Sequence, residues 1–194
     1  NVLGKAIKET VNIGQLLVEI SSFANPYPYV SKNIECFIAQ FFRQTGNEAL
    51  IEEYDLEPFT LNVLDKRQTL TEKLVSLIRF SLSENYIYDV AAKIRHFYDL
   101  HYMLKDEECK DYIYSEQFKI DFKVLLDHDR ATFDNPEGWN TMDIEQSPLL
   151  SDFSSLWANL KTTYMKELPA IAFSDIPDAE EVAMSFEEIA KQLI

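Results

Sequence analysis

The sequence predicts an α+β fold that is predominantly helical, with about two early strands and a C-terminal helical bundle. Glycine and proline are scarce, at 4 and 7 of 194 residues, which disfavours a turn-rich all-β fold. Apolar residues recur at helical spacing through most of the chain, whereas strand-like segments occur only early in it. Hydrophobic residues make up 46% and charged residues 26%, as expected for a globular domain and not for a disordered chain.

The first third of the chain combines helical and strand-like patterns. Apolar residues near helical spacing open the chain, and Gly14 is a plausible stop for this helix. A Pro-rich loop is expected at 25–30, and one or two helices are expected at 31–54, broken near 45–47. Residues 57–64 alternate as a strand does.

Residues 15–22, QLLVEISS, predict a short buried strand that carries Glu19 among apolar residues. A carboxylate in such a run costs several kcal/mol unless it is paired or binds a metal. Two interpretations of Glu19 therefore stay open, a metal ligand and a residue on the solvent face of an edge strand.

The rest of the chain predicts a series of helices. Thr69-Leu-Thr-Glu72 has the capping-box pattern, so a helix is expected from there to about Leu82, with Leu74 and Leu77 on its apolar face. The segment 129–148 is loop-like. Apolar residues at i, i+3/i+4 spacing predict the remaining helices at 86–104, 115–127, 151–167 and 179–193.

One lysine and two residues of the next helix form the leading candidate site. Lys73 lies between Leu70 and Leu77, so its stem can follow the core surface and deliver the ammonium to a cleft. Arg95 and Asp99 are four residues apart and share a helix face on which they can pair.

Two packed helices can bring Lys73 and Asp99 into one pocket. A lysine that holds phosphates and an aspartate that binds a proton or metal suit phosphoryl or nucleotidyl transfer. The competing interpretation is an ordinary surface ion pair beside a lysine whose stem covers the core.

Other motifs exclude several classes of site. The sequence contains no glycine-rich phosphate loop, no nucleophile elbow and no H-E-x-x-H motif. His128-Asp129 supplies the doublet of a metal phosphohydrolase, but it comes where the 115–127 helix ends and no later Asp matches it. Cys36 and Cys109 are far apart, which favours free thiols in a reducing cytosol over a disulfide or zinc scaffold.

The whole chain has a net charge of -15, and the negative charge is concentrated in its second half. Residues 1–97 carry 10 Lys and Arg against 12 Asp and Glu, and residues 98–194 carry 8 against 21. The first half can therefore still meet a phosphate-bearing substrate, whereas extensive RNA contact by the whole chain is disfavoured. No apolar run has the length of a membrane span and no leader opens the chain, so a cytoplasmic protein without membrane contact is expected.

Two blocks carry a resemblance to a known family. Pro58-Phe59 precedes Glu72-Lys73, and Arg95-His96-Phe97-Tyr98-Asp99-Leu100 follows after a short interval. This arrangement resembles the AbiEii-type nucleotidyltransferases, the toxin component of type IV toxin–antitoxin and abortive-infection systems. The resemblance extends from about Gln15 through the tail, where Trp139, Pro148-Leu149-Leu150 and Trp157 are also similar.

The family resemblance implies a division of the chain and an incomplete catalytic core. The family core needs a Gly-Ser-type motif for the triphosphate and an Asp-x-Asp pair on a strand for the metal ions. The sequence shows neither in that setting, so it is expected to be the C-terminal portion of such a protein and inactive alone. Residues 1–66 are then a remnant of a nucleotidyltransferase-like α/β core, whose sheet the early strands complete, and residues 67–194 a C-terminal helical domain.

The resemblance also implies roles and partners. Lys73 contacts phosphate, Arg95 contacts phosphate or braces Asp99, and Asp99 orients or deprotonates the attacking group or positions Lys73. Glu19 supplies a carboxylate for Mg²⁺, which prefers oxygen ligands. The expected partners are a nucleoside triphosphate (NTP), an RNA or protein acceptor and a cognate antitoxin.

A rival interpretation belongs to a different class of protein. A non-enzymatic helical interaction module would use the acidic second half to dock a basic partner, such as an antitoxin with a DNA-binding domain.

Overall fold

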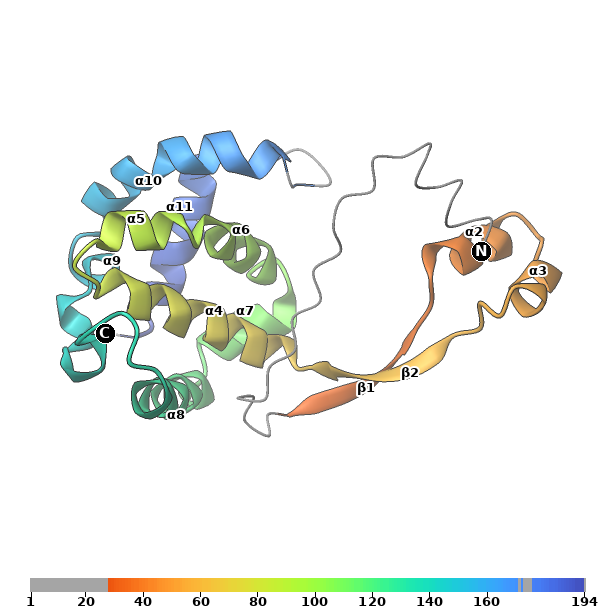
Figure 1. Cartoon of the computed structure of the whole chain (residues 1–194), viewed down its shortest axis with the longest axis horizontal. Helices are drawn as coiled ribbons and strands as arrows, with labels where there is room; N and C mark the ends of the chain where they lie inside the picture. The colour runs from red at the N-terminus through yellow and green to blue at the C-terminus, as the bar shows by residue number, and fades with distance from the viewer. Residues whose placement is uncertain (1–27, 171, 173–175, 194) are drawn as a thin grey trace.

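A computed structural model of the chain describes residues 28–170, 172 and 176–193. They form a helical body and an arm, residues 28–64, that projects from it (Figure 1). The expected opening helix, the expected strand at 15–22 and Glu19 lie outside the described residues. The predicted class is confirmed, since helices predominate and one small antiparallel sheet accompanies them.

The arm is a two-stranded ribbon with two short helices at its tip. Its elements are, in order, β1 Tyr29–Ile34, α2 Phe37–Gln44, α3 Ala49–Glu53 and β2 Phe59–Leu64. The strand expected at 57–64 and the break near 45–47 are confirmed, and Gly46 there has a φ of 72°, which glycine adopts readily. The expectation of loop and helix across 29–34 is wrong, because this segment pairs with β2 as an antiparallel strand.

The two faces of the ribbon differ in chemistry. Directly opposed residues share a face, and on one face Ser31 donates to Asn62 (3.0 Å) and Thr60 to Asn33 (2.9 Å). The other face, the apolar face of the ribbon, carries Lys32 and five apolar side chains: Val30, Ile34, Phe59, Leu61 and Val63. Most of these apolar side chains are exposed; Phe59, for example, has 57% of its surface open to solvent. A two-stranded ribbon of this kind is marginally stable on its own in water.

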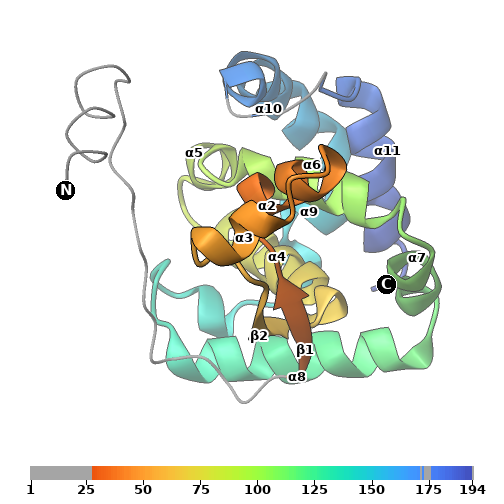
Figure 2. The ribbon, with the colours of Figure 1, turned by 90° about the vertical axis from the view of Figure 1, so that its right-hand side faces the viewer.

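The helical body surrounds α4, Lys66–Ser81, which continues almost directly from β2 (Figure 2). Its other helices are α5 Tyr86–Ala91, α6 Ile94–Met103, α7 Glu107–Ile113, α8 Glu116–Thr132, α9 Pro148–Ser151, α10 Phe153–Glu167 and α11 Ala179–Ala190. Short 3-10 turns at Trp139–Thr141, Ile144–Gln146 and Leu168–Ala170 complete it. Within the described residues, none of these helices combines the length and apolar composition that crossing a bilayer requires.

Several helix boundaries differ from those expected. α4 begins three residues before Thr69, because the Asp65 carboxylate accepts the Arg67 backbone N–H (2.8 Å) and caps it there. The helix expected at 86–104 is interrupted between α5 and α6. The α8 helix continues to Thr132, so His128-Asp129 lies within a helix and not at its end.

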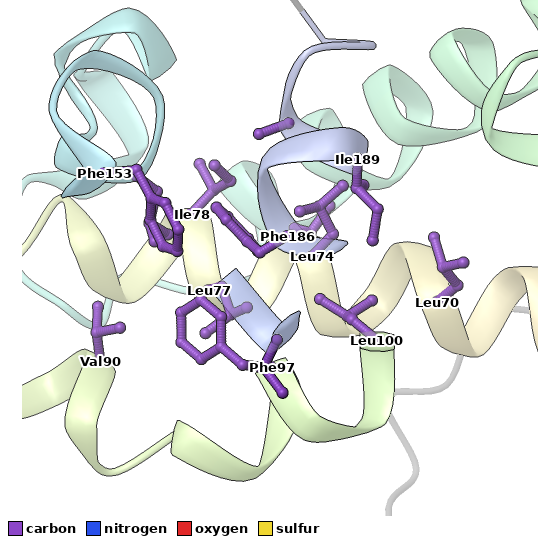
Figure 3. Close-up of a cluster of buried hydrophobic side chains, with 14 of the residues drawn as sticks. Leu70, Leu74, Leu77, Ile78, Val90, Phe97, Leu100, Phe153, Phe186 and Ile189 are labelled. Carbon is purple, nitrogen blue, oxygen red and sulfur yellow. The ribbon is translucent and has the colours of Figure 1, made fainter. Parts of the chain in front are cut away.

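The core of the body joins residues from distant parts of the chain (Figure 3). α4 contributes the stripe that its spacing predicts and packs mainly against α5, α6 and α8, while α11 packs on α6 and α10 on α5. The members of this core include Leu70, Leu74, Leu77, Ile78, Phe97, Leu100, Phe153, Phe186 and Ile189. Full burial of one such side chain is worth about 1.5–3 kcal/mol, so this cluster fixes the relative positions of α4 and α6. The division at residues 66 and 67 stays a prediction.

Candidate functional site

Lys73 and Asp99 meet at the surface between α4 and α6. The Lys73 ammonium donates to Asp99 Oδ2 at 2.6 Å. Both side chains are partly exposed, at 22% and 34%. Leu70, Leu74 and Leu77 anchor the Lys73 helix in the core, while Phe97 and Leu100 anchor the other. The core therefore holds a cation and an anion together at a place that solvent or a ligand can reach.

Arg95 does not take part in the contact between Lys73 and Asp99. It lies in the first turn of α6 and is exposed. The expected pairing with Asp99 is not observed, since the Asp99 carboxylate turns to Lys73 and no ion pair of Arg95 occurs within the described residues. Arg95 is thus an uncommitted cation on the helix that carries Asp99.

His96 adds a neutral group beside this pair. Burial, followed by the charges of Lys73 and Lys93, lowers the pKa of His96 to about 4. Its Nδ1 atom is buried and has no hydrogen-bond partner among the residues the structure describes. Sequence reasoning did not assign His96 to the site, although its position inside the block at 95–99 was a usable signal.

Two further carboxylates, Glu72 and Asp129, influence each other across α4 and α8. Burial raises the pKa of Glu72, and the negative charge of Asp129 raises it further. Burial also raises the pKa of Asp129, against the opposing effects of His128 and of Arg79, whose guanidinium lies 3.7 Å away. Packing of α8 on α4 thus places Asp129 close enough to Glu72 for the two charges to interact. This proximity was not visible in the sequence.

Metal-ligating side chains do not gather at one place within the described residues. No group of three or more His, Cys, Asp and Glu side chains able to hold a metal ion occurs among them. Asp127-His128-Asp129 matches the Asp-x-Asp pattern, but it lies in a helix. Side chains two positions apart in a helix point in directions about 200° apart, so these two carboxylates diverge. Asp99 is committed to Lys73, and Glu19 lies outside the described residues.

Comparison with known proteins gives one result for this chain. The profile of the family described as nucleotidyl transferase AbiEii toxin, type IV TA system, matches residues 9–185. The match includes Lys73, Arg95 and Asp99. No curated protein and no solved structure matches the chain.

Proposed function

Because the chain belongs to the AbiEii nucleotidyltransferase toxin family of type IV toxin–antitoxin systems, we propose that it helps to transfer a nucleotide from an NTP to an RNA or protein acceptor. The observation that supports this most directly is the contact between Lys73 and Asp99. It brings an ammonium and a carboxylate within 2.6 Å of each other at an accessible surface, and these groups suit phosphate binding and proton transfer.

The proposed chemistry separates the roles of the side chains. The Lys73 ammonium binds a phosphate oxygen of the NTP and offsets negative charge that builds up during transfer. This contact partly frees the Asp99 carboxylate, which then orients the attacking hydroxyl and accepts its proton. Arg95, as an exposed cation one turn earlier on α6, adds a second contact to phosphate. His96 is neutral near pH 7, so it can accept or donate a hydrogen bond there without adding charge.

We also propose that residues 1–66 belong to a nucleotidyltransferase-like α/β core. The exposed apolar face of the ribbon supports this, because such a face is stabilised when further polypeptide covers it. The Mg²⁺ ligands and triphosphate-binding motif belong to that core in this proposal, with Glu19 as one carboxylate. The 194 residues alone are then expected to be inactive, and detectable nucleotide transfer by them in isolation would refute this part.

The roles are tested in the whole toxin, as encoded by its gene. Lys73→Ala and Asp99→Asn should each abolish growth arrest on expression, with protein levels unchanged. Lys110→Ala and Asp111→Asn are matched controls, since they remove the same charges from the exposed surface of α7 and should leave toxicity intact. Full toxicity of both site variants would show that the assigned roles are wrong.

A non-enzymatic interaction module is the second candidate. It is favoured by a surface cavity beside α11, whose lining includes Glu181, Glu187, Glu188 and the exposed Met184. Such a mixture of carboxylates and apolar surface suits a basic partner segment. Loss of partner binding in Glu181→Gln/Glu188→Gln, with toxicity unaffected by the Lys73 variant, would favour this module over the enzyme.

A further inference from the structure

A separate cavity of about 300 Å³ lies between α8 and the segment around Ile144. One face of α8 supplies most of its lining, at positions 119, 122, 123, 126, 127 and 130. Asp143 and Ile144 form the opposite wall, and Leu193 closes it from beyond α11. Three segments that are distant in sequence thus build this cavity. None of its lining residues belongs to the Lys73–Asp99 site.

Positive charge exceeds negative charge around this cavity. The lining contains three cations, Lys119, Lys123 and Arg130, and two carboxylates, Asp127 and Asp143. None of the three cations makes an ion pair within 4 Å among the described residues, whereas the Asp143 carboxylate already accepts the Glu145 backbone N–H at 3.2 Å. This concentration of cations stands out in a half of the chain that carries 8 basic against 21 acidic residues. The charge balance favours an anion.

Arg130 is held in position and still has donors to offer. Its Nη2 donates to the Met142 carbonyl at 2.6 Å, which fixes the guanidinium between α8 and the opposite wall. Its Nε is buried and lacks a hydrogen-bond partner in the part of the chain that the structure describes. Buried donors without an acceptor are rare in folded proteins. A guanidinium whose charge is not paired suits the oxygens of a phosphate, and two nearby lysines suit its second negative charge.

The remaining lining is apolar. Phe122 and Leu126 are only 4% exposed, and Ile144 and Leu193 complete the apolar surface. A volume of about 300 Å³ is at the small end of ligand cavities, which is too small for a chain of three phosphates with its nucleoside. The ligand therefore combines one phosphate with one compact apolar group.

We propose that this cavity binds a small phosphate monoester whose organic group is aromatic or otherwise apolar. Arg130, Lys119 and Lys123 hold the phosphate, and the Phe122–Leu126 surface takes up the organic group. Asp127 at the rim repels the phosphate and limits its affinity. The proposal does not depend on nucleotide transfer at Lys73 and Asp99.

Phenyl phosphate is the probe, titrated into the 194-residue chain and followed by amide chemical shifts in NMR. Saturable shifts are expected in α8 and around Ile144. Inorganic phosphate and phenol are the controls, because each represents one half of phenyl phosphate. Phenyl phosphate should bind about tenfold more tightly than either of them. Absence of saturable shifts, or shifts confined to other elements, would overturn the proposal. Equal affinity for phosphate alone would show that the apolar surface takes no part and would also overturn it.

Charge variants test the assignment of residues. Lys119→Gln/Lys123→Gln should weaken phenyl phosphate binding at least about fivefold, and Asp127→Asn should tighten it. Both lysines are exposed, so the fold should persist, and circular dichroism checks this. Lys110→Gln/Lys166→Gln removes the same two charges elsewhere on the body and should change the affinity less than twofold. An equal loss in both double variants would mean that overall charge, and not this cavity, determines binding.

Discussion

His96 should make the protein less stable in mild acid, and His96→Asn should remove that effect. In the folded chain the pKa of His96 is lowered from 6.5 to about 4, first by burial and then by the charge of Lys73. Between these two values the unfolded chain binds a proton that the folded chain does not, so stability falls as the pH drops below 6.5. Above pH 7 both states are neutral and His96 has no effect of this kind.

The size of the effect follows from the two pKa values. The gap corresponds to roughly 3 kcal/mol at full protonation, at about 1.4 kcal/mol per pH unit. At pH 5.5 only part of it is expressed, about 1.5 kcal/mol. A pH of 5.5 lies one unit above the sequence pI of about 4.5. The protein therefore keeps a net charge, whereas low net charge near the pI promotes precipitation.

Urea unfolding followed by circular dichroism at pH 7.5 and 5.5 measures this difference. The wild type should lose about 1.5 kcal/mol more than His96→Asn between the two pH values. Lys73→Gln, which removes the second cause of the shift, should reduce the loss partially. If wild type and His96→Asn respond to pH in parallel, His96 is not a buried neutral imidazole and its proposed place beside Lys73 is wrong.

Three further predictions concern the framework of the site. Leu77→Ala, at a fully buried position, should lower the free energy of unfolding by about 2–5 kcal/mol in urea denaturation, and a loss below about 1 kcal/mol would contradict its packing. Ser147→Ala removes the partner of Ser81 (2.6 Å) and should cost about 1–3 kcal/mol in thermal unfolding, with a much smaller additional cost of Ser81→Ala in that background. A double-mutant cycle on Lys73 and Asp99 should give a coupling of only about 0.2–1 kcal/mol, because both side chains are partly solvated; a coupling above about 2 kcal/mol would indicate a structural pair.

Elements whose burial follows a local period were predictable from the sequence. The apolar stripe of α4 and the alternation of β2 report directly which side chains face a neighbour, so their positions were recovered. β1 was not, since YVSKNI becomes a strand only through pairing with a segment some 30 residues later in the chain. The interruption between α5 and α6 was hidden because apolar spacing continues across it.

The candidate site was predictable to the same extent. Lys73 and Asp99 flank apolar stripes on neighbouring helices, so periodicity allowed their meeting but left an ordinary surface ion pair as the competing interpretation. The approach of Asp129 to Glu72 depends on how α8 packs on α4, and no local pattern encodes that packing. Whether Asp99 pairs with Lys73 or with Arg95 likewise depends on how α4 packs against α6, which the sequence does not show.

The connection between the arm and the helical body at Asp65 is very short. A single residue separates β2 from α4, and its carboxylate is bound both by the Arg67 backbone and by the Arg67 guanidinium (2.7 Å), which leaves little slack. Lys73 lies about two turns further along the same helix. The short connection therefore links the direction of the ribbon to the first turn of α4.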